Sequence, residues 1–114
     1  MLTAPSRLRR PADFKSVMRR GRRSGNDTVV VYVALTGDAS SMAGFAVSRT
    51  VGGAVVRNRV TRRLRAILAE LLPGVPQGTK IVVRALPPAA DASYAQLKSD
   101  VVDAAGRSLA KALR

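Results

Sequence analysis

The sequence predicts a single α+β domain over residues 1–114, a two-layer sandwich of about four strands and three helices. The order of the patterns predicts the class: a helix, two strands, a long helix, another strand and a last helix. The length predicts one domain, because 114 residues are not comfortably enough for two. The hydrophobic content of 46% predicts a packed core and argues against a disordered chain.

The first predicted element is a helix over residues 11–20. Pro11 suits its first turn, where the missing N–H costs nothing. Three apolar side chains share one face at helical spacing: Phe14, Val17 and Met18. Gly21 is the expected end of the helix, because glycine readily adopts the left-handed conformation that terminates many helices.

Two strands are predicted next. Residues 28–35 are β-branched and aromatic, which is typical of a strand covered on both faces. Turn residues at 37–41 lead into a second strand over 43–49, which we expect to pair with the first as an antiparallel hairpin. A short extra strand is predicted near residues 22–24.

A loop at residues 51–54 then opens a long helix. It ends near Leu72, because Pro73 and the following glycine stop it. Residues 79–86 form the next predicted strand, and this strand and 43–49 are candidates for a parallel pair. The general rule for such a pair makes the crossover through the long helix right-handed.

The last predicted helix runs from about Asp91 or Ser93 to Leu113. Its apolar stripe has helical spacing and consists of Tyr94, Leu97, Val101, Ala105 and Leu109. Asp100 and Asp103 lie three residues apart on this helix and are the nearest acidic pair. We interpret them as ordinary solvent-facing charges rather than a metal site.

The charge balance predicts a polyanionic partner. Twenty basic residues, sixteen of them Arg, stand against seven acidic ones, which gives a net charge of +13. Such a chain is strongly drawn to polyanions, and a guanidinium can grip a phosphate with two hydrogen bonds. The sequence has no apolar run of about 20 residues and no secretory signal. A cytoplasmic nucleic acid is therefore the expected partner, and a membrane surface is the weaker alternative.

The most informative segment is residues 55–65, which a helix divides into two faces. The apolar side chains here and in the following turns fall on one side: Val56, Val60, Leu64, Ile67, Leu68 and Leu71. The polar side chains fall elsewhere: Asn58, Arg62 and Arg65 opposite the apolar side, Arg59 and Arg63 on one flank, and Arg57 on the other. Like charges on adjacent turns repel by about a few tenths of a kcal/mol per pair, and a bound polyanion relieves that repulsion. The pattern favours contact with RNA or DNA over an ordinary solvated face.

Three stretches around this segment carry a resemblance to a known family. They are Gly44-Phe45-Ala46-Val47-Ser48-Arg49, Val51-Gly52-Gly53-Ala54-Val55-Val56-Arg57-Asn58-Arg59 and Arg62-Arg63-Leu64-Arg65. Together they resemble the signature of the protein component of bacterial ribonuclease P, whose centre is Arg57-Asn58-Arg59. The resemblance covers nearly the whole chain, from the Asp13-Phe14 helix to the last amphipathic helix.

The resemblance implies a small α+β domain whose strand–helix–strand crossover is left-handed. This contradicts the general rule, and we follow the family. It also implies a task, because the family protein binds the catalytic RNA of ribonuclease P and the two together release the 5′ leader of precursor tRNA. The implied partners are that RNA and precursor tRNA, with no membrane and no small-molecule cofactor.

By position, the resemblance implies two RNA-binding surfaces. The first lies against the catalytic RNA and consists of Arg57, Asn58, Arg59, Arg62, Arg63 and Arg65. The second is a shallow cleft for the single-stranded leader, at Phe14, Met18, Tyr32, Ser48 and Arg49. Aromatic side chains suit such a cleft because any unpaired base offers a face for stacking. Anchoring of the first helix by Phe14, and an ordinary strand role for Tyr32, are equally weighted alternatives.

Four positions depart from the family pattern. Thr61 and Thr50 stand where basic residues are usual, Gly53 replaces a common Asn, and Met18 replaces a frequent aromatic. Thr61 removes one expected phosphate contact. We expect Arg63, at a position that is often apolar, to compensate for it.

The composition leaves the protein few means of catalysis. The absence of Cys and His excludes disulfides, thiolate and imidazole metal sites and imidazole bases. Phosphodiester hydrolysis needs a general base or metal-binding carboxylates, and the seven acids are scattered. We expect no catalytic residue and no cofactor site in the protein, and Mg²⁺ in the RNA–protein holoenzyme. The alternatives are a ribosomal or assembly protein of the same fold, and an autonomous nuclease.

Overall fold

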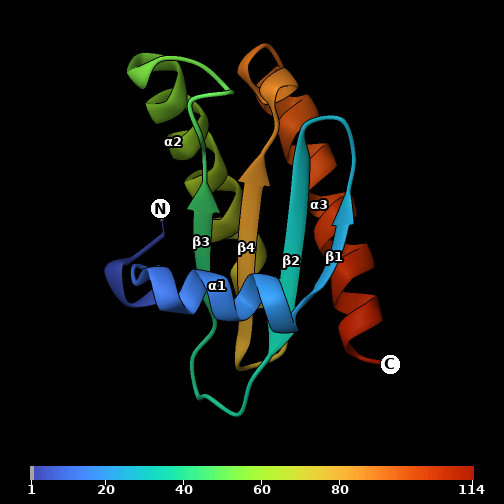
Figure 1. Cartoon of the computed structure of the whole chain (residues 1–114). Coiled ribbons are helices and arrows are strands. Elements are labelled where there is room, and N and C mark those ends of the chain that lie inside the picture. Colours follow the sequence, from blue (N-terminus) through green and yellow to red (C-terminus); the bar gives the residue numbers. More distant parts are fainter. Residues whose placement is uncertain (1) are drawn as a thin grey trace.

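A computed structural model describes residues 2–114 (Figure 1). The helices and strands are, in chain order, α1 (Pro11–Arg20), β1 (Arg22–Gly25), β2 (Val29–Leu35), β3 (Met42–Ala46), α2 (Ala54–Leu71), β4 (Thr79–Ala85) and α3 (Tyr94–Ala112). Short 3-10 turns are η1 (Ala4–Ser6), η2 (Leu72–Gly74) and η3 (Pro87–Ala90). The predicted helices, and the short strand near residues 22–24, are confirmed. No helix in this part of the chain is long and apolar enough to cross a membrane.

The sheet has the strand order β1-β2-β4-β3. β2 pairs antiparallel with both β1 and β4, whereas β3 pairs parallel with β4. The predicted hairpin between residues 28–35 and 43–49 is therefore wrong. The side chains of β4 from Thr79 to Val83 are all buried. Because of this burial, β4 lies between β2 and β3 in the sheet.

The crossover from β3 through α2 to β4 is left-handed. In Figure 1 both strands point upward, β4 lies to the right of β3, and α2 passes behind the sheet. The general expectation of a right-handed crossover is wrong here, and the handedness implied by the family resemblance is confirmed. A right-handed connection would place α2 on the front face of the sheet, which α1 occupies.

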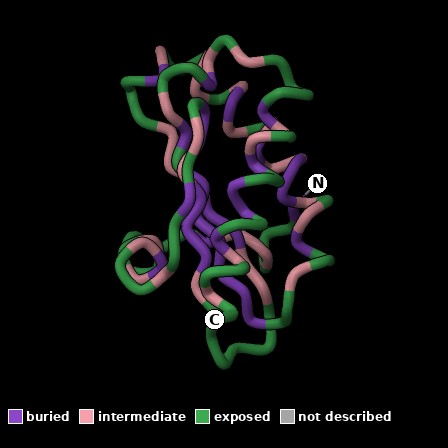
Figure 2. The backbone as a smooth tube through the Cα atoms, turned by 90° about the vertical axis from the view of Figure 1, so that its right-hand side faces the viewer, coloured by how far each residue is buried: buried purple, intermediate pink, exposed green. Residues whose placement is uncertain are grey.

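The two faces of the sheet bury unequal cores. The main core lies between the sheet and helices α2 and α3, and Figure 2 shows the buried backbone concentrated there. Its largest fully buried side chains include Leu64, Ile67, Leu68, Ile81 and Leu97. The smaller core under α1 contains Leu8, Val17, Tyr32 and Val82. Apolar contact therefore holds α2 and α3 more extensively than α1.

Gly21 ends α1, but not in the predicted left-handed conformation. Its backbone is extended, with φ −75° and ψ 166°. A Cβ atom there would lie 2.5 Å from the Val17 carbonyl oxygen and 2.9 Å from that of Val33. Close approach of two backbone segments, rather than a positive φ, is what requires glycine at this position.

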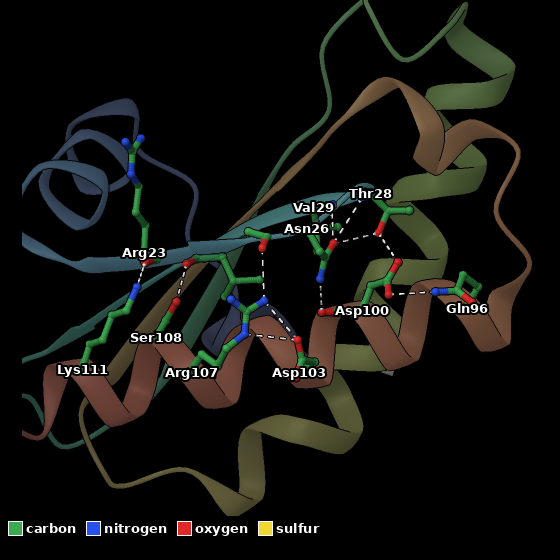
Figure 3. Close-up of polar contacts among 12 residues, drawn as sticks. Arg23, Asn26, Thr28, Val29, Gln96, Asp100, Asp103, Arg107, Ser108 and Lys111 are labelled. Carbon is green, nitrogen blue, oxygen red and sulfur yellow. Dashed lines mark hydrogen bonds and ion pairs between the residues drawn. The ribbon is translucent and has the colours of Figure 1, made fainter.

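Polar contacts join α3 to the β1–β2 hairpin (Figure 3). The Asp100 carboxylate accepts a hydrogen bond from the Thr28 hydroxyl at 2.7 Å, and the Asn26 amide donates to the Asp100 carbonyl at 2.9 Å. The buried Ser108 hydroxyl donates to the Val31 carbonyl at 2.7 Å. These bonds fix α3 along the sheet edge, because each joins a helical residue to the hairpin.

Candidate nucleic-acid interface

Helix α2 carries the predicted RNA-binding residues and is anchored by its apolar side. Val60, Leu64, Ile67 and Leu68 are buried in the main core, and Val56 and Leu71 pack against its margin. The predicted apolar stripe is confirmed. Because these residues fix the rotation of the helix about its axis, they also determine which polar side chains face outward.

The outward side of α2 forms a shallow depression of about 460 Å³. It is lined by Val55, Asn58, Thr61, Arg62 and Arg65, and we call this set the arginine face. The structure thus brings together the three residues that helical geometry places opposite the core. Asn58 and Arg62 are exposed, and Arg65 is half-buried. Cationic and amide donors in one open hollow suit a phosphate backbone.

Arg59 and Arg63 take a different position. The Arg59 Nη2 donates to the Ala90 carbonyl at 2.9 Å, and the Arg63 Nη1 donates to the Ala92 carbonyl at 3.0 Å. Both side chains therefore bridge α2 to the segment that leads into α3. Glu70, two turns further along the same side, pairs with Lys98 of α3 at 2.7 Å.

None of the α2 arginines is neutralised by a carboxylate within residues 2–114. The ion pairs there are Lys80–Asp38, Lys98–Glu70 and Arg107–Asp103. Arg59 and Arg63 bond only to neutral carbonyl groups, so they also keep their positive charge. Five formal charges therefore remain on one helix for an external anion.

The departure at Thr61 has a local structural role. Its hydroxyl donates to the Arg57 carbonyl, one turn earlier, at 2.9 Å. This hydroxyl replaces a long cation at the rim of the depression. Arg57 itself is half-buried, and the Nε atoms of Arg57, Arg59 and Arg65 are buried, so their stems lie against the protein surface.

The predicted leader cleft falls on the α1 face of the sheet. Phe14 and Met18 are half-buried, and Tyr32 is only 5% exposed. The Phe14 ring packs directly on Gly44, so that a Cβ atom at residue 44 would lie 2.6 Å from the ring. This contact anchors α1, and it explains the glycine in the Gly44 stretch.

Ser48 and Arg49 lie beyond the end of β3 and are exposed, and the Ser48 hydroxyl is hydrogen bonded to that of Thr50 at 2.7 Å. The cleft assignment of these two residues and of Phe14, Met18 and Tyr32 stays a prediction.

Two further exposed arginines lie on this face and were not part of the predicted cleft. Arg23 is opposite Tyr32 in the β1–β2 register, and Arg84 is opposite Val30 in the β2–β4 register. Paired residues share a face, so both point to the side of the sheet that α1 covers. In the sequence, the alternation of Val82 with Arg84 indicates that the two side chains share one face of a strand. It could not show which helix covers that face until the strand order was known.

The two acidic residues of the pair on α3 are engaged in structural contacts. Asp100 accepts hydrogen bonds from Thr28 and from Gln96, and Asp103 pairs with Arg107 at 3.0 Å. Asp100 is therefore not the plain solvent-facing charge that we expected. Within residues 2–114 no three carboxylates gather in a group that could hold a metal ion.

Comparisons with known proteins agree with the observed fold. The pattern of the family described as Ribonuclease P matches residues 2–108. The ribonuclease P protein component of Acidothermus cellulolyticus is 51% identical over 109 residues, covering 94% of this chain and 91% of that protein. The solved RNase P protein of Staphylococcus aureus superimposes with a TM-score of 0.80 at 25% identity, covering 90% and 94% of the two chains. That of Thermotoga maritima gives a TM-score of 0.75 at 26% identity, covering 85% and 92%.

Proposed function

This chain belongs to the ribonuclease P protein family, and on that premise we propose that it binds the catalytic RNA of ribonuclease P through helix α2. Membership makes it a protein component of the ribonucleoprotein that processes tRNA 5′ ends. The observation that carries the proposal is the arginine face, an open hollow whose cations have no carboxylate partner among the described residues.

The proposed contact is electrostatic and sequence-independent. Arg62 and Arg65 take the place of counterions condensed on the phosphates of a folded RNA. Asn58 adds hydrogen-bond donors and an acceptor on the same face of the helix. The half-buried stem of Arg65 limits the freedom that this side chain loses on binding. We expect the affinity to fall steeply as the salt concentration rises.

The second proposed contact holds the single-stranded 5′ leader of precursor tRNA on the α1 face. Phe14 and Met18 supply half-buried apolar surface at the edge of α1, and Arg49, Arg23 and Arg84 supply exposed charge. Tyr32 is nearly covered, so its role is to support this surface from below rather than to offer a free ring. We expect the leader to be held mainly by its phosphates.

The proposed division of labour leaves hydrolysis to the RNA. Mg²⁺ belongs to the holoenzyme, where RNA phosphates can ligate it. Within residues 2–114 no three carboxylates gather to hold it. Asp100 and Asp103 bond instead to Thr28, Gln96 and Arg107. The protein's part is to dock the RNA and to place the substrate.

Reconstitution tests the proposal. The full chain is added to the catalytic RNA of a bacterial ribonuclease P with precursor tRNA and Mg²⁺ at physiological salt. We expect faster leader removal and tighter binding of precursor than of mature tRNA, and no cleavage by the chain alone. If turnover and leader affinity are unchanged by the chain, the proposal fails. Binding to ribosomal RNA instead would favour the assembly-protein alternative.

A further inference from the structure

Tyr94, the first residue of α3, does not pack where its position in the apolar stripe predicts. The stripe is buried from Leu97 to Ala105, and Leu109 is partly buried against the core. Tyr94 lies in neither hydrophobic cluster of the described chain and is 37% exposed. The other three aromatic side chains, Phe14, Tyr32 and Phe45, are half-buried or buried. Tyr94 is therefore the most exposed of the four aromatic side chains, all of which lie within the described residues.

The segment that carries Tyr94 is held in place from α2. Arg59 and Arg63 bond to the carbonyls of Ala90 and Ala92, at 2.9 and 3.0 Å. The Ser93 hydroxyl caps α3 by accepting from the Gln96 backbone N–H at 3.1 Å. We call residues 90–94 the bridged segment. Both ends of it are fixed, so the backbone that carries the aromatic ring is held in place beside α2.

The bridged segment borders the arginine face. Arg59 lies three residues before Arg62 on α2 and therefore neighbours it on the helix surface. The outward charges continue from Arg65 through Arg62 to the two bridging arginines, and then to the bridged segment. Figure 1 shows η3 and the start of α3 at the same end of the molecule as the first turns of α2.

We propose that Tyr94 is a stacking platform for an unpaired nucleotide of the RNA that docks on α2. The inference rests on the proposed function. The nearby arginines of α2 are the reason to expect a nucleic acid, rather than an apolar protein surface, as the partner of the ring. Every base has a face that can stack on a tyrosine ring, whatever its identity. An RNA backbone neutralised by Arg62 and the bridging arginines has its bases beside this partly exposed ring.

The proposal gives Arg59 and Arg63 a role besides charge. They are positioning residues, because their carbonyl bonds orient the ring rather than contact the base. It also revises the expectation that Arg63 compensates for the absence of a basic side chain at Thr61. One of the terminal nitrogens of Arg63 is instead committed to Ala92.

The test compares three replacements of Tyr94 in the full chain, using the catalytic RNA as the probe. Tyr94→Phe keeps an aromatic face, Tyr94→Leu keeps apolar bulk without it, and Tyr94→Ala removes both. We expect Kd to rise roughly 5- to 100-fold for the Ala and Leu variants, the range for losing one stacked base. We expect Tyr94→Phe to bind within about twofold of the unmodified chain.

Intrinsic fluorescence provides an independent signal because the chain has no Trp and only two Tyr. RNA should quench the emission of the unmodified chain more than that of Tyr94→Phe, and the difference belongs to Tyr94. Thermal melting of each variant checks folding, which should change little at an exposed first helical position.

A double-mutant cycle tests the bridge. Arg63→Leu removes one charge whatever residue 94 is, so the charge effect is equal in the two backgrounds. If Arg63 positions the ring, its replacement must cost less affinity in Tyr94→Ala than in the unmodified chain.

The outcomes separate the inference from its premise. If Arg62→Ala/Arg65→Ala loses RNA and all three Tyr94 variants bind normally, the stacking platform is wrong and the arginine face stands. If Tyr94→Leu binds as well as Tyr94→Phe, the contact is apolar packing and the proposal is overturned. If the unmodified chain binds no catalytic RNA, the proposed function itself fails.

Discussion

Helices α2 and α3 are of similar length, 18 and 19 residues, and both carry cations, but they use them differently. The three cations of α3 have partners within the chain. Lys98 pairs with Glu70. Arg107 pairs with Asp103 and donates to the Gly25 carbonyl, and Lys111 donates to the Arg23 carbonyl (Figure 3). On α2, Arg62 and Arg65 have no hydrogen-bond or ion-pair partner in the described chain.

We infer from the difference that the pairing of charges, rather than their number, distinguishes the proposed binding face from a structural one. Lys111 and Arg107 donate to carbonyls of β1, which is an edge strand and would otherwise offer them to another strand. Those charges serve the fold. The charges of the arginine face have no partner in the described chain, and their mutual repulsion costs free energy. An external anion would offset that cost.

The largest expected effect comes from removing two cations from each helix in matched variants. Arg62→Ala/Arg65→Ala should weaken binding of the catalytic RNA roughly 10-fold or more and reduce the salt slope by up to about 0.7 for each phosphate that is no longer neutralised. Arg107→Ala/Lys111→Ala removes the same charge but should leave the salt slope nearly unchanged. Filter binding across a salt series measures both.

The free energy of unfolding should show the reverse order. The α2 variant leaves the apolar side untouched, so its stability should stay within about 0.5 kcal/mol of the unmodified chain. The α3 variant exposes the edge of β1 and should be the less stable. Equal losses of RNA affinity in the two variants would mean that only the total charge matters. The proposed difference between the cations of α2 and those of α3 would then be wrong.

Local patterns predicted most of the fold, and long-range order was what they missed. The three helices, the split of α2 into two sides and the end of α1 follow from spacing within one element. The hairpin error had another cause: sequence adjacency favoured pairing residues 28–35 with 43–49, but the burial of β4 decided the strand order. No local signal in β3 reports which strand lies beside it.

The candidate site shows the same limit. Helical geometry correctly grouped Asn58 with Arg62 and Arg65, because all three lie on one rigid element. It could not show that Arg59 and Arg63 reach backbone carbonyls of a segment about 30 residues later. Likewise, Tyr94 fits an apolar stripe by spacing alone, and only the packing of α3 against the sheet leaves it outside the core.

An intermediate effect is expected from Asp100, which ties α3 to the hairpin. Asp100→Ala removes the acceptor of the 2.7 Å bond from Thr28 and of the 2.8 Å bond from Gln96. Loss of a hydrogen-bonded charged group should reduce the free energy of unfolding by about 1–3 kcal/mol. RNA binding at a temperature where the variant is folded should be unchanged. Urea denaturation measures the change in stability. A loss of RNA affinity in the folded variant would assign a binding role to the side of α3 that faces the hairpin, which the comparison denies it.

The smallest effect is expected from the exposed Lys98–Glu70 pair between the two helices. The hydrogen bond from Lys98 to Glu70, and then the charge of Glu70, raise the Lys98 pKa above its ordinary 10.5. A raised lysine pKa stabilises the fold below that ordinary value, and the contribution is lost as the pH rises through the raised pKa. Glu70→Gln should therefore hardly change the melting temperature at neutral pH and physiological salt, where exposed pairs are screened. The small difference should shrink further above pH 10.5, as Lys98 loses its charge in both proteins. A large neutral-pH loss, insensitive to salt, would show that this pair holds α2 against α3 and that the apolar core between them does less than its burial indicates.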